Sequence, residues 1–269
     1  MSIILNIVIP CYNEQEVLPE TSSRLLNKMQ GLIHSEKISR KSRITFVNDG
    51  SKDETWNLIC DLHKENSIFS RVNLSINKGH QYALLAGLLT VMNDADVVIS
   101  MDADLQDDIN AIDEMLDKYL QGCDIVYGVR SSRETDTFFK RFTATMYYRM
   151  MNALGVRTVF NHADYRLMSK RALHRLNEFN EVNLFLRGVV PLIGYKTDIV
   201  YYRRNVRFAG KSKYPLNKML EFAWEGVTSF SIKPIRIISA LGGIIFAFSI
   251  LMLIYILIRY IKGETIVGW

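Results

Sequence analysis

The fold is decided at Val97-Val98-Ile99-Ser100-Met101-Asp102-Ala103-Asp104. A short apolar run of this kind is typical of a strand that is buried on both faces, as in a parallel sheet. Two carboxylates follow directly, at the carboxyl end of the strand, where ligands bind in open α/β sheets. Such a pair suits a hard divalent cation that also holds substrate phosphates. Taken alone, however, an Asp-x-Asp is more typical of a solvated turn.

The first half of the chain alternates apolar strands with helical patterns. Strands are predicted at residues 5–10, 43–48, 72–76, 97–101 and 125–129, and helices at 14–30, 53–65, 79–92 and 109–120. This alternation predicts an α/β fold with a mostly parallel sheet covered on both faces.

Four of these predicted strands are followed by polar segments. The segments are Pro10–Glu14, Asn48–Thr55, Asn77–Gln81 and Asp102–Asp107. Each has a plain local explanation, since Asn-Asp-Gly-Ser forms ordinary turns and Asp53 could cap its helix. Because all four lie at one edge of one sheet, we expect them to form a shared ligand site.

Composition and charge limit the classes of ligand that the site could bind. The 269 residues are 48% hydrophobic and carry a net charge of +5, which indicates an anionic partner: a nucleotide, a phospholipid surface or nucleic acid. The three cysteines and five histidines lack the spacing of metal ligands, which is typical of a reduced, cytosolic domain. Neither a dinucleotide fingerprint nor a P-loop is present. The short apolar start of the chain is predicted to be the first strand, not a signal peptide.

The C-terminal part predicts a membrane anchor. Residues 215–230 show an amphipathic helical stripe, and residues 237–258 contain no charge, which is long enough to span a bilayer. Basic residues are in excess before this span, so residues 1–236 are expected in the cytoplasm. Residues 137–154 predict a further helix, packed on the core or lying near an anionic surface. The expected division is a catalytic domain at 1–213, an interfacial helix at 214–233, a transmembrane helix at 234–260, and a short tail at 261–269 that ends before a second span.

Together, these motifs resemble a known family. The matching stretches are Pro10-x-Tyr12-Asn13-Glu14, Asn48-Asp49-Gly50-Ser51-x-Asp53-x-Thr55, Asn77-x-Gly79, Asp102-x-Asp104-Leu105-Gln106, Gly128-x-Arg130, Asp164-Tyr165-Arg166-Leu167 and Arg207-x-x-Gly210-x-Ser212-Lys213-Tyr214. The chain resembles family 2 glycosyltransferases of the GT-A fold. It is most similar to the bacterial polyprenyl-phosphate (bactoprenol) type, which is similar to dolichyl-phosphate mannose synthases.

The resemblance implies roles for individual residues. Nucleotide binding falls to Pro10, Tyr12, Glu14, Asp49, Lys78, Gly79 and Asp102. A Mg2+ or Mn2+ ion would be held or oriented by Asp102, Asp104 and Gln106. The acceptor phosphate would meet Arg130, Arg207, Lys211 and Lys213. The residues expected at the reaction centre are Asp104, Arg130, Asp164 and Arg207.

The implied reaction is inverting transfer of a hexose, glucose or N-acetylglucosamine, from a UDP-sugar to undecaprenyl phosphate. It would take place at the inner face of the cytoplasmic membrane and supply a lipid-linked donor for cell-envelope glycosylation. A homo-oligomer is a further expectation, and no nucleic acid is expected as a partner. The alternatives are a processive polysaccharide synthase, whose Gln-x-x-Arg-Trp motif is missing, and a catalytically silent nucleotide-binding scaffold. Two departures stand out. Asp107-Asp108 replaces the family's usual Pro-Pro, which predicts a looser turn, and there is one span where bacterial members usually have two.

Overall fold

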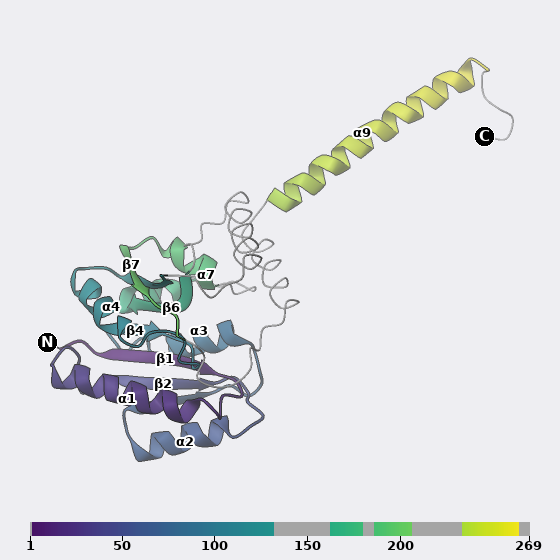
Figure 1. The fold of residues 1–269 in the computed structure, drawn as a ribbon. Coiled ribbons are helices and arrows are strands. Elements are labelled where there is room, and N and C mark those ends of the chain that lie inside the picture. Colours follow the sequence, from purple (N-terminus) through teal and green to yellow (C-terminus); the bar gives the residue numbers. More distant parts are fainter. Residues whose placement is uncertain (1, 132–161, 180–185, 206–232, 264–269) are drawn as a thin grey trace.

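The computed structural model describes residues 2–131, 162–179, 186–205 and 233–263. Its centre is a seven-stranded sheet in the order β3-β2-β1-β4-β6-β5-β7 (Figure 1). The strands are β1 (Leu5–Cys11), β2 (Arg43–Asn48), β3 (Phe69–Asn73), β4 (Val97–Ser100), β5 (Ile125–Arg130), β6 (His162–Ser169) and β7 (Thr197–Tyr202). Strand β6 runs antiparallel to β4 and β5, and the other pairs are parallel. The prediction of a mostly parallel α/β sheet is confirmed.

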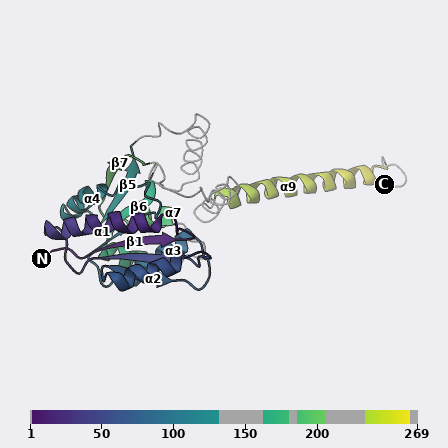
Figure 2. The ribbon, with the colours of Figure 1, turned by 60° about the horizontal axis from the view of Figure 1, so that its bottom comes forward.

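Helices cover both faces of the sheet (Figures 1 and 2). They are α1 (Leu18–His34), α2 (Thr55–Glu65), α3 (His80–Val91), α4 (Ala111–Leu120), α6 (Lys170–Asn177), α7 (Leu186–Val189) and the 3-10 helix η1 (Val190–Ile193). One apolar core joins α1, α2 and α4 to the sheet, and a second joins α3, α6, α7 and η1 to the opposite face. The inner strands β1, β2 and β4 are buried along almost their whole length, because each face of the sheet contributes to a core.

The third strand was predicted too late in the sequence. It spans Phe69–Asn73 instead of residues 72–76. Phe69 is buried and its ring stacks on that of Phe46 in β2, with 5.9 Å between centroids. Ile76, by contrast, is 57% exposed. Aromatic stacking therefore fixes the strand, and residues 74–79 are left as the loop that reaches the site.

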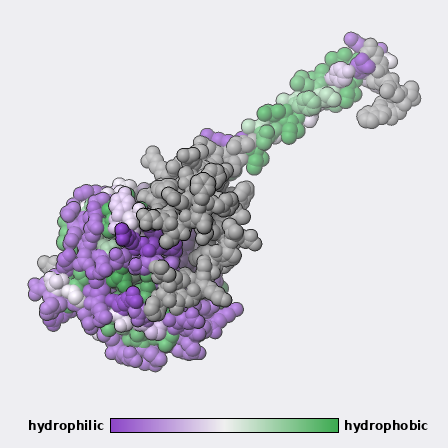
Figure 3. Space-filling view, in the orientation of Figure 1, coloured by the Kyte–Doolittle hydropathy of each residue, from purple (hydrophilic) through white to green (hydrophobic). Residues whose placement is uncertain are grey.

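A long apolar helix, α9 (Lys233–Ile261), follows. Within the described residues it is the one helix long and apolar enough to cross a membrane, with a mean hydropathy of 2.7 over Ile238–Ile261 and none of that window buried. The 24 residues of this apolar part would extend about 36 Å as a helix. It projects away from the sheet domain (Figures 1 and 2), and its surface is largely apolar whereas the visible surface of the domain is largely polar (Figure 3). The predicted helices at 137–154 and 215–230 lie outside the described residues.

Candidate active site

The loops after β1 and β2 are joined by hydrogen bonds between backbone and side chains. The amide of Asn13 donates to Ser51 Oγ at 3.0 Å, and the amide of Glu14 donates to Thr55 Oγ1 at 2.8 Å. These bonds explain why the Asn-Asp-Gly-Ser-x-Asp-x-Thr pattern needs its hydroxyls. They hold Tyr12 and Glu14 half-buried at the edge of the sheet, whereas Pro10 is buried within β1.

Asp49 joins this pair of loops to the loop before α3. Its carboxylate is buried and accepts from the amides of Lys78 at 2.7 Å and Gly79 at 3.0 Å. Gly79 has a φ of 90°, and Gly50 has a φ of 62° and lies where a β-carbon would come within 2.6 Å of the backbone nitrogen of Asn77. Both glycines adopt a backbone conformation that other L-residues rarely take. The side chain of Lys78 is exposed beside them.

The Asp-x-Asp turn is held by a hydrogen bond from α1 and by one within the turn itself. Thr21 Oγ1 donates to the carbonyl of Ala103 at 2.7 Å, and the amide of Gln106 donates to Asp104 Oδ1 at 3.1 Å. Leu105 has a φ of 58°, an uncommon conformation for a residue with a bulky side chain. Asp104 is largely buried and Asp102 is half-buried. These two hydrogen bonds and the left-handed conformation of Leu105 therefore fix the backbone of the turn, which places both carboxylates at the end of β4.

A charged cluster connects Asp102 to the second half of the sheet. His80 Nε2, at the start of α3, lies 3.6 Å from Asp102 Oδ1 and 3.4 Å from Asp164 Oδ2. Asp164 is also paired with Arg166 at 2.6 Å and with Arg187 of α7 at 3.0 Å. Two guanidinium groups and an imidazole thus converge on one buried carboxylate, which fits the requirement that buried charges be paired.

The pKa values of the cluster follow from these contacts. Burial alone would raise the pKa of Asp164, but the charge of Arg187 and the hydrogen bond from His80 hold it well below 3.8. Burial disfavours charged His80, yet its bond to Asp164 and the charge of Asp102 raise its pKa. The pKa of Asp102 is raised by burial, opposed by charged His80, and raised further by its acidic neighbours Asp164 and Asp104. Asp164 is therefore a firmly ionised, weak base, and Asp102 stands where added positive charge would be favourable.

The turn after the Asp pair is held by the end of β7. Tyr202 Oη donates to Asp107 Oδ1 at 2.5 Å, and the amide of Asn205 donates to the carbonyl of Gln106 at 2.9 Å. The guanidinium of Arg204 donates to Gln106 Oε1. Arg130 Nε donates to Tyr202 Oη at 3.4 Å. Burial and the charge of Asp102 raise the pKa of Asp107 to about 6.

The donor set at Asp102 and Asp104 fits a divalent cation that is shared with a diphosphate. Mg2+ in particular is usually bound through one or two carboxylates together with substrate phosphates, not in an all-protein cage. Among the residues that the structure describes, no group of three or more His, Cys, Asp or Glu side chains is arranged to hold a metal. Burial raises the pKa of Asp102, the charge of His80 opposes this rise, and the neighbouring acids Asp164 and Asp104 add to it; a cation bound at this turn would therefore be stabilised. Gln106 reaches Arg204 instead, so its side chain is engaged with the end of β7.

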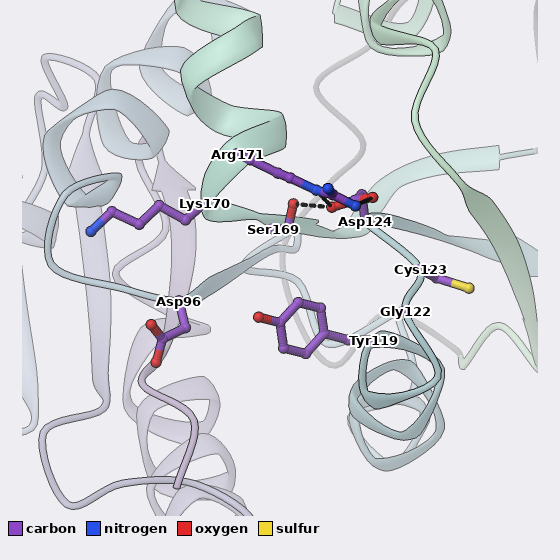
Figure 4. A pocket seen from close by; sticks show the side chains of 8 residues that line it. All are labelled: Asp96, Tyr119, Gly122, Cys123, Asp124, Ser169, Lys170 and Arg171. Carbon is purple, nitrogen blue, oxygen red and sulfur yellow. Dashed lines mark hydrogen bonds and ion pairs between the residues drawn. The ribbon is translucent and has the colours of Figure 1, made fainter. Parts of the chain in front are cut away.

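A separate cavity of about 310 Å3 lies at the other end of the sheet (Figure 4). It opens beside Asp96 and Asp124, which precede β4 and β5, and Ser169 at the end of β6. Its acids are already engaged: Asp124 with Arg171 and Ser169, and Asp96 with the amide of Ile4. The cavity is thus a structural crevice, away from the carboxyl ends of β1, β2 and β4.

The structure brings together most of the predicted site. The segments after β1, β2 and β4 and the loop before α3 meet at one edge, with Asp164 and Arg130 beside them. Arg207, Lys211 and Lys213 lie outside the described residues. The sequence analysis placed His80 in the polar segment Asn77–Gln81 but gave it no role of its own, and its place at the start of α3 is what brings it to the cluster. It assigned no site role to Arg187, Arg204 or Tyr202, which are brought in by tertiary contacts alone.

The sequence matches known proteins. The profile of glycosyl transferase family 2 matches residues 6–176, and the chain belongs to that family. It is a glycosyltransferase. It is 53% identical over 99% of its length to an uncharacterized glycosyltransferase, YkoT, of Bacillus subtilis, covering 79% of that protein. It is also 36% identical over 88% of its length to a prophage bactoprenol glucosyl transferase homolog of Escherichia coli, covering 76% of that protein.

Solved structures share the fold at low identity. Mannosyl-3-phosphoglycerate synthase of Rubrobacter xylanophilus superimposes with a TM-score of 0.56 at 13% identity, over 89% of this chain and 75% of that one. Glucosyl-3-phosphoglycerate synthase of Mycobacterium tuberculosis, in complex with Mn2+, UDP and phosphoglyceric acid, gives 0.51 at 13% identity, over 84% and 77%. At this identity the likeness shows the fold alone. The predicted GT-A class is confirmed.

Proposed function

We propose that this glycosyltransferase moves a hexose, glucose or N-acetylglucosamine, from a UDP-sugar to undecaprenyl phosphate at the cytoplasmic face of the membrane, with Mg2+ or Mn2+ as cofactor and with inversion at the anomeric carbon. The observation that carries the proposal is the placement of Asp102 and Asp104 at the end of β4, between the loops of β1 and β2 and the basic side chains of Arg130 and Arg204. The relatives named as bactoprenol glucosyl transferases support the choice of acceptor.

On the donor side, the loops after β1 and β2 would hold the nucleoside through Tyr12, Glu14 and Asp49. Asp102 and Asp104 would hold the metal ion. When bound, the ion would offset the charge that develops on the diphosphate as it leaves. Arg130 lies beside the same turn and would add to this electrostatic stabilisation.

On the acceptor side, the chemistry of a phosphate monoester explains why the reaction needs no strong general base. Such a group has a second pKa near 6 and is largely ionised at neutral pH, so it attacks the anomeric carbon without a strong general base. Asp164 agrees with this, because Arg187, His80 and Arg166 hold it ionised and it is therefore a poor proton acceptor. Its proposed role is to keep these cations in place. Arg130, with Arg207, Lys211 and Lys213, would receive the acceptor phosphate.

The membrane part of the proposal rests on α9. A helix with exposed apolar side chains over Ile238–Ile261 is suited to a bilayer, and a lipid phosphate acceptor lies at the bilayer surface. The basic excess before this helix would place the catalytic domain in the cytoplasm and attract anionic head groups.

The test is transfer of label into lipid. Membranes containing the full chain are supplied with Mg2+ and undecaprenyl phosphate, and with labelled UDP-glucose, UDP-N-acetylglucosamine or GDP-mannose in parallel. We expect one UDP-hexose to label the organic-extractable lipid, with loss of transfer in Asp104→Asn. Asp94→Asn, a change at an exposed acid just after α3, should leave transfer intact. Absence of transfer from every donor by folded, membrane-bound protein would contradict the proposal and favour a silent scaffold.

A further inference from the structure

Two consecutive residues of the turn after the Asp pair accept hydrogen bonds from residues at and just after the end of β7. Gln106 is held through its carbonyl by the amide of Asn205 at 2.9 Å and through its side chain by Arg204. Asp107 is held through its carboxylate by Tyr202 Oη at 2.5 Å. The turn that carries the proposed metal ligands is therefore attached to the strand that leads into residues 203–205.

This attachment is buried and built from packed side chains. Asp107 is 2% exposed and Tyr202 is 3% exposed. The ring of Tyr165 packs edge-on against that of Tyr202, with 5.3 Å between centroids, and Tyr165 Oη donates to the carbonyl of Asp108 at 2.9 Å. The two tyrosines thus hold Asp107 and Asp108 from one side of the sheet.

Burying Asp107 has a cost that calls for an explanation. Its Oδ2 has no hydrogen-bond partner among the residues that the structure describes, and Arg130 Nη2 is 3.8 Å from its Oδ1. A buried carboxylate that is only partly satisfied destabilises a fold. A hydrophobic or proline residue would avoid this cost, so the acid is better explained by what its bond to Tyr202 does.

We propose that Tyr202 and Asp107 are positioning residues whose hydrogen bond fixes the turn at 102–108 against the end of β7. This bond performs here the stiffening that a pair of prolines at positions 107 and 108 would provide. The inference rests on the proposed function in one respect, namely that Asp102 and Asp104 bind the metal ion. The hydrogen bond would then keep these carboxylates at a constant separation from Arg203 and Arg204. Neither Tyr202 nor Asp107 is assigned a contact with substrate.

Hydrogen exchange in the full chain, solubilised in detergent, tests the positioning role without any ligand. Tyr202→Phe removes only the hydroxyl. We expect amide exchange at residues 103–110 to rise about tenfold, while exchange in β1 and β2 stays unchanged. Tyr201→Phe, at the exposed neighbour on the same strand, is the matched control and should change nothing. Unchanged exchange at residues 103–110 in folded Tyr202→Phe would overturn the proposal.

Metal-dependent binding of UDP gives the second readout. Changes to groups that support metal ligands commonly weaken metal affinity by about tenfold to a hundredfold, so Tyr202→Phe should raise the Mn2+ concentration needed for UDP binding by about tenfold. Asp107→Asn retains an acceptor for Tyr202 and should behave much more like the original protein than Asp107→Ala does. Equal effects of Asp107→Asn and Asp107→Ala would contradict a role through this bond. If the exchange effect is present while the original protein transfers no sugar, the proposed function fails and the positioning role stands.

Discussion

His80 Nε2 lies 3.6 Å from the carboxylate of Asp102. Since His80 also contacts Asp164, it links the turn after β4 to β6, two segments that sequence order keeps far apart. Through this link the proposed metal site shares one electrostatic environment with the buried Arg166 and the half-buried Arg187.

The first prediction concerns the Asp pair. Asp104→Asn should lower the transfer rate roughly a thousandfold, because several kcal/mol of leaving-group stabilisation would be lost. Calorimetry should show that Mn2+-dependent UDP binding is lost as well, at an unchanged melting temperature. Transfer by Asp104→Asn at the original rate would exclude Asp104 as a metal ligand.

The second prediction concerns Asp164. Asp164→Asn leaves Arg166 and Arg187 without their carboxylate, and breaking a buried ion pair in this way costs about 3 kcal/mol of unfolding free energy. Denaturant unfolding of the solubilised protein measures this value. Glu178→Gln removes the partner of Arg175 in an exposed pair and should cost less than about 1 kcal/mol. Equal losses in both variants would mean that the cluster around Asp164 has no special structural role.

The third prediction concerns Gly50. A β-carbon at this position would lie 2.6 Å from the backbone nitrogen of Asn77, in a residue with a φ of 62°. We therefore expect Gly50→Ala to destabilise the protein by about 1–3 kcal/mol and to weaken UDP binding by displacing the loop that Asp49 holds. Gly31→Ala, within α1, is the control. A β-carbon at this position would meet nothing within 4 Å, so the substitution should stabilise the helix by up to about 1 kcal/mol. Normal UDP binding by Gly50→Ala would contradict the role assigned to this loop.

The fourth prediction concerns the pH dependence of stability. The hydrogen bond from Arg171 lowers the pKa of Asp124 below 3.8, against the opposing effect of burial, and Ser169 adds to the lowering. The unfolded chain therefore binds more protons in acid, so the stability that Asp124 contributes is complete above about pH 5 and is lost as the pH falls through 3.8 towards the lowered value. Asp124→Asn should melt at a lower temperature than the original protein at pH 6, with the difference shrinking by pH 3. A difference that grows in acid would contradict this assignment.

Much of the fold could be predicted from local pattern. The apolar runs ending at Asn48 and Ser100 identify parallel strands because both of their faces are buried, and the polar segments after them locate the site. Strand β6 escaped prediction because its alternate residues Asp164 and Arg166 are charged and yet buried, which hides the apolar pattern that normally reveals a strand. No local rule predicts that two such charges will neutralise each other inside a sheet.

The site could be predicted only as far as its loops. Asp49, Asp102 and Asp104 follow strands, and strand order brings them together. Arg187 and Tyr202 come from elements beyond β6, and their places depend on how that part of the chain packs. For the same reason the replacement of a proline pair by Asp107-Asp108 predicted a looser turn, whereas the structure shows that Tyr202 and Tyr165 hold it.

The mass of the lipid product distinguishes transfer of a single hexose to undecaprenyl phosphate from the alternative reactions. Purified full-length protein is incubated with Mg2+, undecaprenyl phosphate and the active UDP-hexose, and the extracted lipid is analysed by mass spectrometry. We expect undecaprenol carrying one phosphate and one hexose, with UDP released. A product with two phosphates, or with a chain of hexoses, would contradict it: the first would indicate transfer of a sugar phosphate, and the second a processive synthase.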